Sequence, residues 1–326
     1  MYQSRSKLIC NIDPYLDQIW QKSQCRKHEW AILGTLENLV NTLPDKSNTY
    51  ICLVDAVPEN VIVNYRTIIT DNILKTDSVQ LWPEFWGTFS YDPEYSDRAP
   101  QKLFNCFMHR TGVMRQTWFY ELIRRELLDL GSVSFLLDYR DNAGYTKGWS
   151  TVEEKQALFQ WIFEKLDAEF LAEHESIRSL VPYRNFHTDL DQAVVDSKIS
   201  LVLETYYDNS MAIAFSEKVF RALQLPRPML LYSGVGAINE LRKIGFDLYD
   251  DIVDHGYDLI VDSNQRQLDI LSRLENFKSF NYTDNTLRDF EQRANKNRNI
   301  LKNLKQNWPH KLDKIVASLR DHNNGE

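Results

Sequence analysis

The pattern of hydrophobic and polar positions predicts strands and helices that alternate through the middle of the chain. Apolar runs typical of buried strands occupy residues 103–108, 132–139, 198–206 and 228–234, with a shorter one at 257–261. Apolar residues at helical spacing fill the intervals, at 112–131, 150–171, 216–225, 236–245 and 264–277. Gly131 and Gly245 are expected to end the helices that precede them. This alternation predicts a parallel sheet with right-handed crossovers and with helices on both faces.

The chain on either side of this region is patterned differently. A helix is predicted at 27–43 and a buried strand at 50–57, before a Pro- and Trp-rich loop at 81–100. The tail reads as helix, with an apolar stripe made of Leu287, Phe290, Ala294, Leu301, Leu304 and Trp308. Pro309 is expected to interrupt this helix before the spacing resumes. With 326 residues, the sequence predicts an α/β protein of two domains, at 1–100 and 101–285, and a basic amphipathic helical extension at 286–326.

The composition is typical of a soluble globular protein. Of its residues 43% are hydrophobic and 26% are charged, and no run of eighteen apolar residues predicts a membrane span. The N-terminus lacks the apolar segment of a secretory signal. The four cysteines lie in the first third without a Cys-x-x-Cys pair, so we expect reduced thiols and no metal site from them. These features predict a cytoplasmic location, in the host cytoplasm if the protein is viral.

The charge is unevenly spread along the chain. A formal net charge of −8 disfavours a broad surface for duplex nucleic acid, yet residues 288–320 hold nine Lys or Arg and three acidic residues. As the solvated face of a helix packed across both domains, this segment needs no partner. As a free surface, it would bind acidic lipid or nucleic acid in a salt-sensitive way. Residues 247–262 hold six aspartates without the order of a calcium loop, which predicts exposed loop and turn rather than a metal site.

Candidate ligand-binding residues follow three of the predicted strands. In doubly wound sheets, ligands bind at the carboxyl ends of the strands, where helix N-termini attract anions. The candidates are Arg110 and Arg115 after the first strand, Glu204, Tyr207, Asn209, Ser216, Glu217 and Lys218 after the strand at 198–206, and Gly234 after the strand at 228–234. The arginines and Lys218 would neutralise a diphosphate, and Glu217 would accept hydrogen bonds from ribose hydroxyls. These charges also have a plainer interpretation, because exposed ion pairs are common at helix starts.

Residues 209–234 resemble the donor-binding segment of α1,3-fucosyltransferases. In that family an Asn-Ser, an aromatic residue shortly before Glu-Lys, a helix and a Pro-led strand with Gly follow in this order. Asn209-Ser210, Phe215-Ser216-Glu217-Lys218 and Gly234 carry the likeness here, with Ser216 in place of Thr and Asn209 one residue closer to the Glu-Lys pair. Residues 102–135, 204–208 and 244–258 also resemble segments of glycosyltransferase-like proteins from bacteriophages and large viruses.

The resemblance implies a GT-B architecture, which has two Rossmann-like domains, and an inverting, metal-independent glycosyl transfer. The sugar would pass from a nucleotide-diphosphate donor, held by the domain at 101–285, to an acceptor hydroxyl held by the domain at 1–100. By position in the motif, Glu217 would bind the ribose and Lys218 the diphosphate. Arg110 or Arg115 would bind the phosphates as well. No metal or cofactor is expected beside the nucleotide sugar.

The catalytic base is expected among the carboxylates of the N-terminal domain. An inverting transfer needs one carboxylate to deprotonate the acceptor hydroxyl as an oxocarbenium-like state develops. Asp55, at the end of the predicted strand, and Glu84, between aromatic residues that could stack on a sugar, are the candidates, with Glu94 as a further one. Each could equally be a turn or capping carboxylate.

Two other functions fit the same pattern. A nucleotide- or carbohydrate-binding protein could keep the donor site without turnover. A DNA-base glycosyltransferase, acting on a hydroxymethylated base, would use the basic segment at 288–320 to hold its polyanionic acceptor. The first alternative predicts that the protein binds the donor but that no carboxylate of the N-terminal domain supports turnover. The second predicts that the protein is retained on DNA at low salt.

Overall fold

The structure is a computed structural model that describes residues 49–52, 67–70, 73–74, 79–81, 90–96, 98–108, 113–135, 188–204, 207 and 212–323. Within these ranges the fold is α/β, built from parallel strands and helices as the sequence predicts. The helices predicted at 27–43 and 150–171 lie outside the described residues. None of the helices in the described ranges has the length and apolar character needed to cross a membrane.

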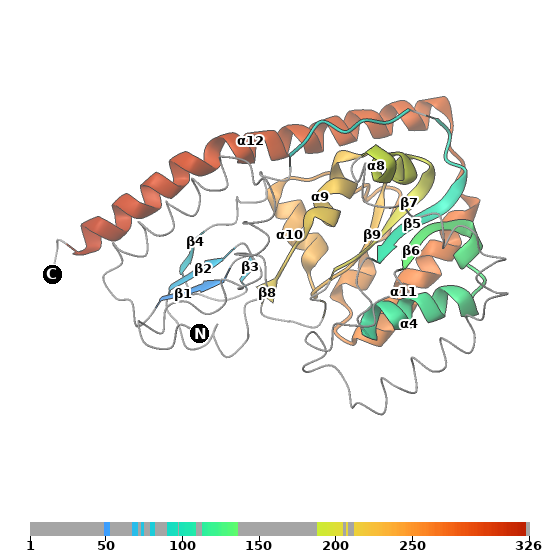
Figure 1. The fold of residues 1–326 in the computed structure, drawn as a ribbon, viewed down its shortest axis with the longest axis horizontal. Coiled ribbons are helices and arrows are strands. Elements are labelled where there is room, and N and C mark those ends of the chain that lie inside the picture. Colours follow the sequence, from blue (N-terminus) through green and yellow to red (C-terminus); the bar gives the residue numbers. More distant parts are fainter. Residues whose placement is uncertain are drawn as a thin grey trace.

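A four-stranded parallel sheet in the order β6-β5-β7-β9 forms the centre of the fold (Figure 1). Its strands are β5 (Lys102–Met108), β6 (Gly131–Phe135), β7 (Ser197–Leu203) and β9 (Met229–Tyr232). Each begins within one residue of a predicted apolar run. Every residue of β9 and nearly every residue of β7 is buried, as expected of parallel strands with helices on both sides.

Helices pack against both faces of this sheet (Figure 1). On one face lie α4 (Val113–Arg124) and α11 (Ser263–Asn276). There the Trp118 ring meets the Tyr232 ring edge-on with 5.1 Å between centroids, and the Arg266 guanidinium lies 5.3 Å from the Tyr232 centroid. On the other face lie α8 (Thr188–Val195), whose Val194 and Val195 pack against Phe107, and α9 (Glu217–Gln224). A further helix, α10 (Ala237–Ile244), follows β9 and ends at Gly245, which has a left-handed φ of 103° as predicted.

The helix predicted at 112–131 ends earlier than expected, and Gly131 is not its cap. Regular α-helix stops at Arg124, Glu126 has a left-handed φ of 54°, and a short 3₁₀ helix, η3 (Leu128–Leu130), leads into β6. Gly131 has extended backbone and starts β6 opposite Phe104. A Cβ at this position would lie 2.5 Å from Cζ of the Phe104 ring. The glycine is therefore needed for packing between two strands, which the helical pattern could not indicate.

The strand predicted at 257–261 is wrong. Residues Gly256–Leu259 form a 3₁₀ helix, η5, beside β9, which is the last strand in the sheet order. Successive backbone N–H groups of a strand point to opposite sides, so Leu231 directs its N–H away from β7. The Tyr257 hydroxyl accepts this N–H at 2.9 Å. A side-chain oxygen thus takes the hydrogen bond that a fifth strand would have accepted.

The N-terminal region contributes a second parallel sheet in the order β1-β2-β4. Its strands are β1 (Thr49–Cys52), which overlaps the start of the strand predicted at 50–57, β2 (Thr67–Thr70) and β4 (Val79–Leu81). The neighbouring strand β3 (Ile73–Leu74) pairs antiparallel with β8 (Ala212–Ile213), which lies shortly before α9. The N-terminal region is therefore hydrogen-bonded to the segment that leads into α9.

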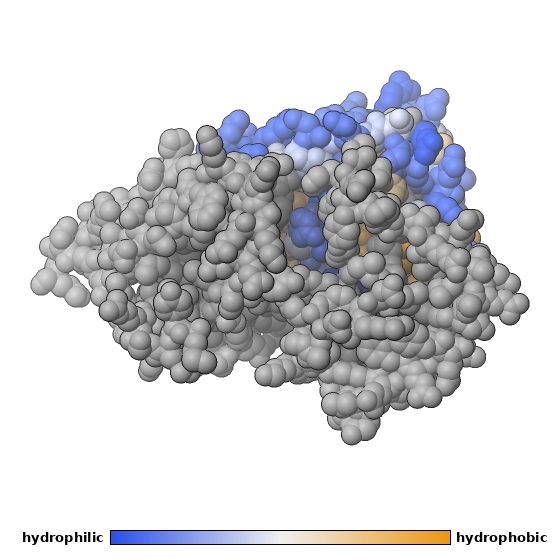
Figure 2. All heavy atoms as spheres, viewed as in Figure 1, coloured by the Kyte–Doolittle hydropathy of each residue, from blue (hydrophilic) through white to orange (hydrophobic). Residues whose placement is uncertain are grey.

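The C-terminal region is a single 40-residue helix, α12 (Asp284–Asn323). Figure 1 shows it running from the four-stranded sheet past the sheet of β1, β2 and β4. Phe290, Ala294 and Leu301 are fully buried, so this part of the predicted apolar stripe is confirmed. The predicted interruption at Pro309 is wrong, because the helix continues through it. Proline already has a helical φ, and its missing N–H frees only the carbonyl of Lys305, an exposed residue to which water has access. In Figure 2 a hydrophilic band follows the edge of the molecule where α12 lies.

Candidate functional site

The candidate site lies at the carboxyl end of β7. Along the chain, β6 joins the sheet on one side of β5, and β7 and β9 then join it on the other side of β5. The order therefore reverses between β5 and β7, and in open α/β sheets such a reversal marks the usual position of a ligand. The groups that follow β7 and β9 thus occupy the part of the fold best placed to bind one.

Glu204 connects the end of β7 to the start of α9. Only 3% of the residue is exposed, and its Oε1 accepts hydrogen bonds from both N–H and Oγ–H of Ser216, each at 2.8 Å. Ser216 is the N-cap of α9, and its Oγ accepts the Lys218 N–H at 3.3 Å. Burial raises the pKa of the Glu204 carboxyl, although the Lys218 ammonium and the two bonds from Ser216 oppose this. Glu204 therefore fixes the position of the first turn of α9.

Glu217 and Lys218 form an ion pair in that first turn. Lys218 Nζ lies 2.8 Å from Glu217 Oε1 and 3.5 Å from Ser216 Oγ. The Glu217 side chain is half exposed, whereas only a quarter of the Lys218 side chain is. Burial opposes ionisation of Glu217, but the Lys218 ammonium outweighs it and lowers the pKa of the Glu217 carboxyl. The turn thus offers one ammonium group and one ionised carboxylate at a helix N-terminus, which suits a ligand that has both an anion and hydroxyl groups.

The other described candidates lie around this turn in different ways. Gly234 is buried at the end of β9, whose strand neighbour is β7. Phe215 is 6% exposed, with its ring edge-on to Phe220 in the core. Tyr207 stacks on Tyr232 with 5.0 Å between ring centroids, on the face covered by α4 and α11. Arg115 is buried in the first turn of α4 on that same face. The contacts therefore join Glu204, Ser216, Glu217 and Lys218 into one cluster, and Tyr207 and Arg115 belong to the opposite side of the sheet.

Four of the candidates from the sequence lie outside the described residues: Asp55, Glu84, Arg110 and Asn209. The two expected catalytic carboxylates are among them. Glu94, the further candidate, is exposed and donates a backbone hydrogen bond to Asp191.

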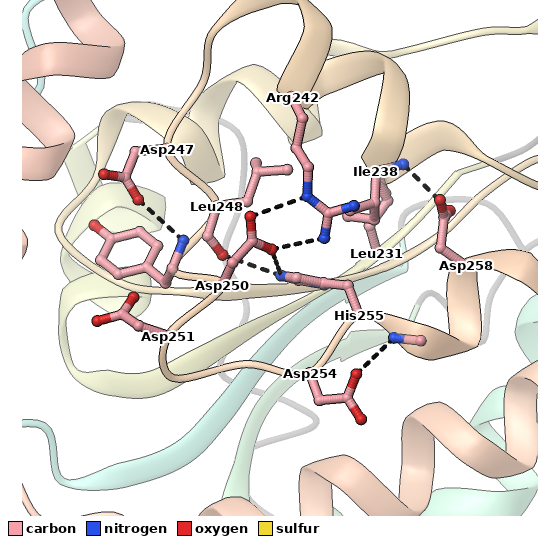
Figure 3. Close-up of polar contacts among 12 residues, drawn as sticks. Leu231, Ile238, Arg242, Asp247, Leu248, Asp250, Asp251, Asp254, His255 and Asp258 are labelled. Atoms are coloured by element: carbon pink, nitrogen blue, oxygen red, sulfur yellow. Dashed lines mark hydrogen bonds and ion pairs between the residues drawn. The ribbon is translucent and has the colours of Figure 1, made fainter.

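Most of the aspartates at 247–262 are exposed, as predicted, but Asp258 is buried. Figure 3 shows the contacts of five of them, Asp247, Asp250, Asp251, Asp254 and Asp258. Asp250 makes a bidentate pair with Arg242, at 2.9 and 2.7 Å. Asp258 accepts the N–H groups of Ile238 and Asn239 at 3.2 and 3.4 Å, so it occupies the N-terminus of α10. That helix start therefore already binds a carboxylate through two N–H groups of its first turn, whereas at the start of α9 the Glu204 carboxylate accepts from the N-cap residue Ser216.

The remaining aspartates of this run have similar roles. Asp262 caps α11 by accepting the Gln265 N–H at 2.7 Å, and Asp254 accepts the Gly256 N–H at 2.8 Å. Asp251 pairs with Arg293 of α12 in a bidentate contact. Among the described residues, no group of three or more His, Cys, Asp or Glu side chains is arranged to hold a metal ion.

Basic residues of α12 are bonded within the chain. Arg293 contacts Asp251 at 2.6 Å, Arg298 donates to the Gln224 carbonyl at 2.7 Å, and Lys302 contacts Asp92 at 2.8 Å. These contacts favour the interpretation of 288–320 as a helix packed across the protein, because Arg293, Arg298 and Lys302 have partners within the chain. They weaken its use as a polyanion-binding surface.

The sequence reasoning missed Ser233, which lies between β9 and Gly234. Its hydroxyl is buried, and it has no hydrogen-bond partner among the residues that the structure describes. Its position directly after a buried strand, next to the candidate Gly234, was the available signal.

Comparison of the chain with protein-family models, curated proteins and solved structures gives no match.

Proposed function

We propose that the protein is a glycosyltransferase of the GT-B type, which transfers a sugar from a nucleotide-diphosphate donor to an acceptor hydroxyl without a metal and with inversion. One observation carries the proposal. Glu204, Ser216, Glu217 and Lys218 meet at the start of α9, beside the strand-order reversal of a parallel sheet. The motif that resembles the fucosyltransferase donor segment thus coincides with the position where such sheets bind ligands.

In this proposal the start of α9 holds the donor. Lys218 and the helix N-terminus attract the diphosphate, and Glu217 accepts hydrogen bonds from the ribose. Ligand binding would exchange the Glu217–Lys218 contact for contacts to the donor. The rate enhancement would come from positioning and from stabilising charge on the leaving diphosphate. The second parallel sheet, β1-β2-β4, supports a GT-B arrangement, with a carboxylate from residues 1–100 as the base.

Thermal unfolding with a panel of nucleoside diphosphates and nucleotide sugars tests the donor site. A ligand at about 100 times its Kd adds about 2.7 kcal/mol to stability. For a domain of about 150–250 residues this raises Tm by roughly 5–11 °C. We expect such a shift with one nucleotide in the wild type and its loss in Lys218→Ala.

Lys243→Ala is the matched control, because Lys243 is also a helical lysine paired with a glutamate, Glu240, at 2.7 Å. It should keep the full shift. No shift with any nucleotide in folded wild type, or equal shifts in the two variants, would contradict the proposal. Once a donor is known, release of its diphosphate in the presence of sugar acceptors separates an enzyme from a binding protein.

A further inference from the structure

The sheet places Ser233 directly beside Glu204. Ser200 pairs with Met229, and its N–H donates to the carbonyl of the preceding residue, Pro228, at 2.9 Å. The Glu204 N–H donates to the Tyr232 carbonyl at the same distance, 2.9 Å. By the same geometry the ladder partner of Glu204 is Ser233. Paired residues of neighbouring strands direct their side chains to the same face, about 5 Å apart.

The helix α9 begins on that same face of the sheet, where the Ser233 hydroxyl is an additional polar group. The residue is 2% exposed, and within the described part of the chain its Oγ has no hydrogen-bond partner. Burying a hydroxyl without a partner destabilises a protein, so such a group calls for an explanation, of which a bound ligand is one. Ser200, on the same face of β7, is equally buried but accepts a hydrogen bond from Asn105 at 3.0 Å. Of these two buried serines, the one at the carboxyl end of the strands is the one whose hydroxyl lacks a partner among the described residues.

The charges nearby determine which ligand group fits there. Ser233 lies next to Glu204, and Glu217 follows in the first turn of α9. Carboxylates repel a phosphate but accept hydrogen bonds from a hydroxyl, and a serine hydroxyl can donate to that same group. The cation, Lys218, is available for the phosphates. A neutral sugar hydroxyl therefore fits between Ser233 and the carboxylates better than an anion does.

We propose that Ser233 is a binding residue of the α9 site, where its Oγ hydrogen-bonds a sugar hydroxyl of the ligand. This assignment rests on the proposed function, because it names the part of the nucleotide-sugar donor that reaches the end of β9. The hydroxyl comes from the ribose or from the transferred sugar, which share this chemistry.

Two serine variants test the unmet hydroxyl in the free protein. Ser233→Ala removes a buried group without a partner, so we expect Tm to rise by about 2–4 °C. Ser200→Ala removes a group with a partner, so we expect Tm to fall by a similar amount. If Ser233→Ala lowers Tm as Ser200→Ala does, the Ser233 hydroxyl has a structural role and the assignment is wrong.

Binding measurements then couple the serine to the ligand. The probes are the nucleoside diphosphate that stabilises wild type most, its 2′-deoxy and 3′-deoxy analogues, and the corresponding nucleotide sugar. Ser233→Ala should weaken binding about 3- to 10-fold. If the ribose is the partner, one deoxy analogue should bind wild type more weakly than the parent nucleotide does, by the same factor. Ser233→Ala should then bind that analogue and the parent nucleotide with equal affinity. If the transferred sugar is the partner, the variant should weaken only the nucleotide sugar.

Equal affinity of wild type and Ser233→Ala for all probes would overturn the assignment. With the shift still lost in Lys218→Ala, that result would leave the proposed function intact. Absence of nucleotide binding by wild type would overturn both.

Discussion

His255 shows how a single buried residue is held in one protonation state. Its Nε2 faces the Leu248 carbonyl at 3.0 Å (Figure 3) and must donate to it. In the neutral ring Nδ1 therefore accepts from the Tyr257 hydroxyl, also at 3.0 Å. Burial lowers the pKa of the imidazole, although the Leu248 carbonyl and Asp250 oppose this. A proton on Nδ1 would also displace the hydrogen of the Tyr257 hydroxyl from its acceptor.

This arrangement predicts a pH dependence of stability. Above pH 6.5, the ordinary pKa of histidine, His255 is neutral in both the folded and the unfolded protein, and its contribution to the free energy of unfolding is complete. Below it the unfolded chain takes up the proton first, so stability is lost as pH falls toward the lower pKa of the folded state, by at most about 1.4 kcal/mol per pH unit. Denaturant unfolding between pH 7.5 and 5 should show a smaller loss in His255→Gln than in wild type.

The contribution of His255 is the difference between the pH profiles of wild type and His255→Gln. Asp191, whose pKa burial raises to about 6, titrates in the same range and acts in the opposite direction, because its folded state binds protons more readily. It contributes equally to wild type and variant. Identical pH profiles would show that His255 is not the group responsible.

At the scale of an element, the outer edge of β9 depends on one side chain. Tyr257→Phe would leave the Leu231 N–H and His255 Nδ1 without their partner at once. We expect a loss of about 1–3 kcal/mol in the free energy of unfolding, together with faster hydrogen exchange at the Leu231 amide. Tyr249→Phe is the control, because that buried hydroxyl donates to the Phe290 carbonyl, at 3.3 Å, and not to a group of β9. Unchanged exchange at Leu231 would contradict this role of Tyr257.

Elements were predictable from the sequence where local pattern and packing agree. β5, β7, β9, α9 and α11 follow their apolar periods, and the start of α9 follows from Ser216 as its cap. The segment at 257–261 was misassigned because Tyr257 and Ile260 look like a strand, yet a tertiary hydrogen bond decides its conformation. Ser233 was missed for a similar reason, since only the register with β7 brings it beside Glu204.

At the scale of the whole molecule, one buried asparagine of α12 binds the backbone at Asp247 through a pair of hydrogen bonds, as a neighbouring strand would. Asn297 is fully buried, accepts the Asp247 N–H at 2.8 Å and donates to the Asp247 carbonyl at 3.0 Å. Asn297→Ala should therefore cost about 1–3 kcal/mol in the free energy of unfolding, because two buried backbone groups lose their partner. Asn303→Ala, at an exposed position of the same helix, should change it by less than about 0.5 kcal/mol. Equal effects in denaturant unfolding would show that α12 is held by other contacts.

The pairing of β3 with β8 also bears on how the protein is made. Residue 73 leaves the ribosome long before residue 213, its partner in the pair. At about 5–20 residues per second, roughly 7–28 s of synthesis separate them. The strand that precedes the α9 turn therefore completes its pairing only after most of the N-terminal region has been translated. Synonymous codons that slow translation between these positions would lengthen the interval in which β3 is without its partner strand.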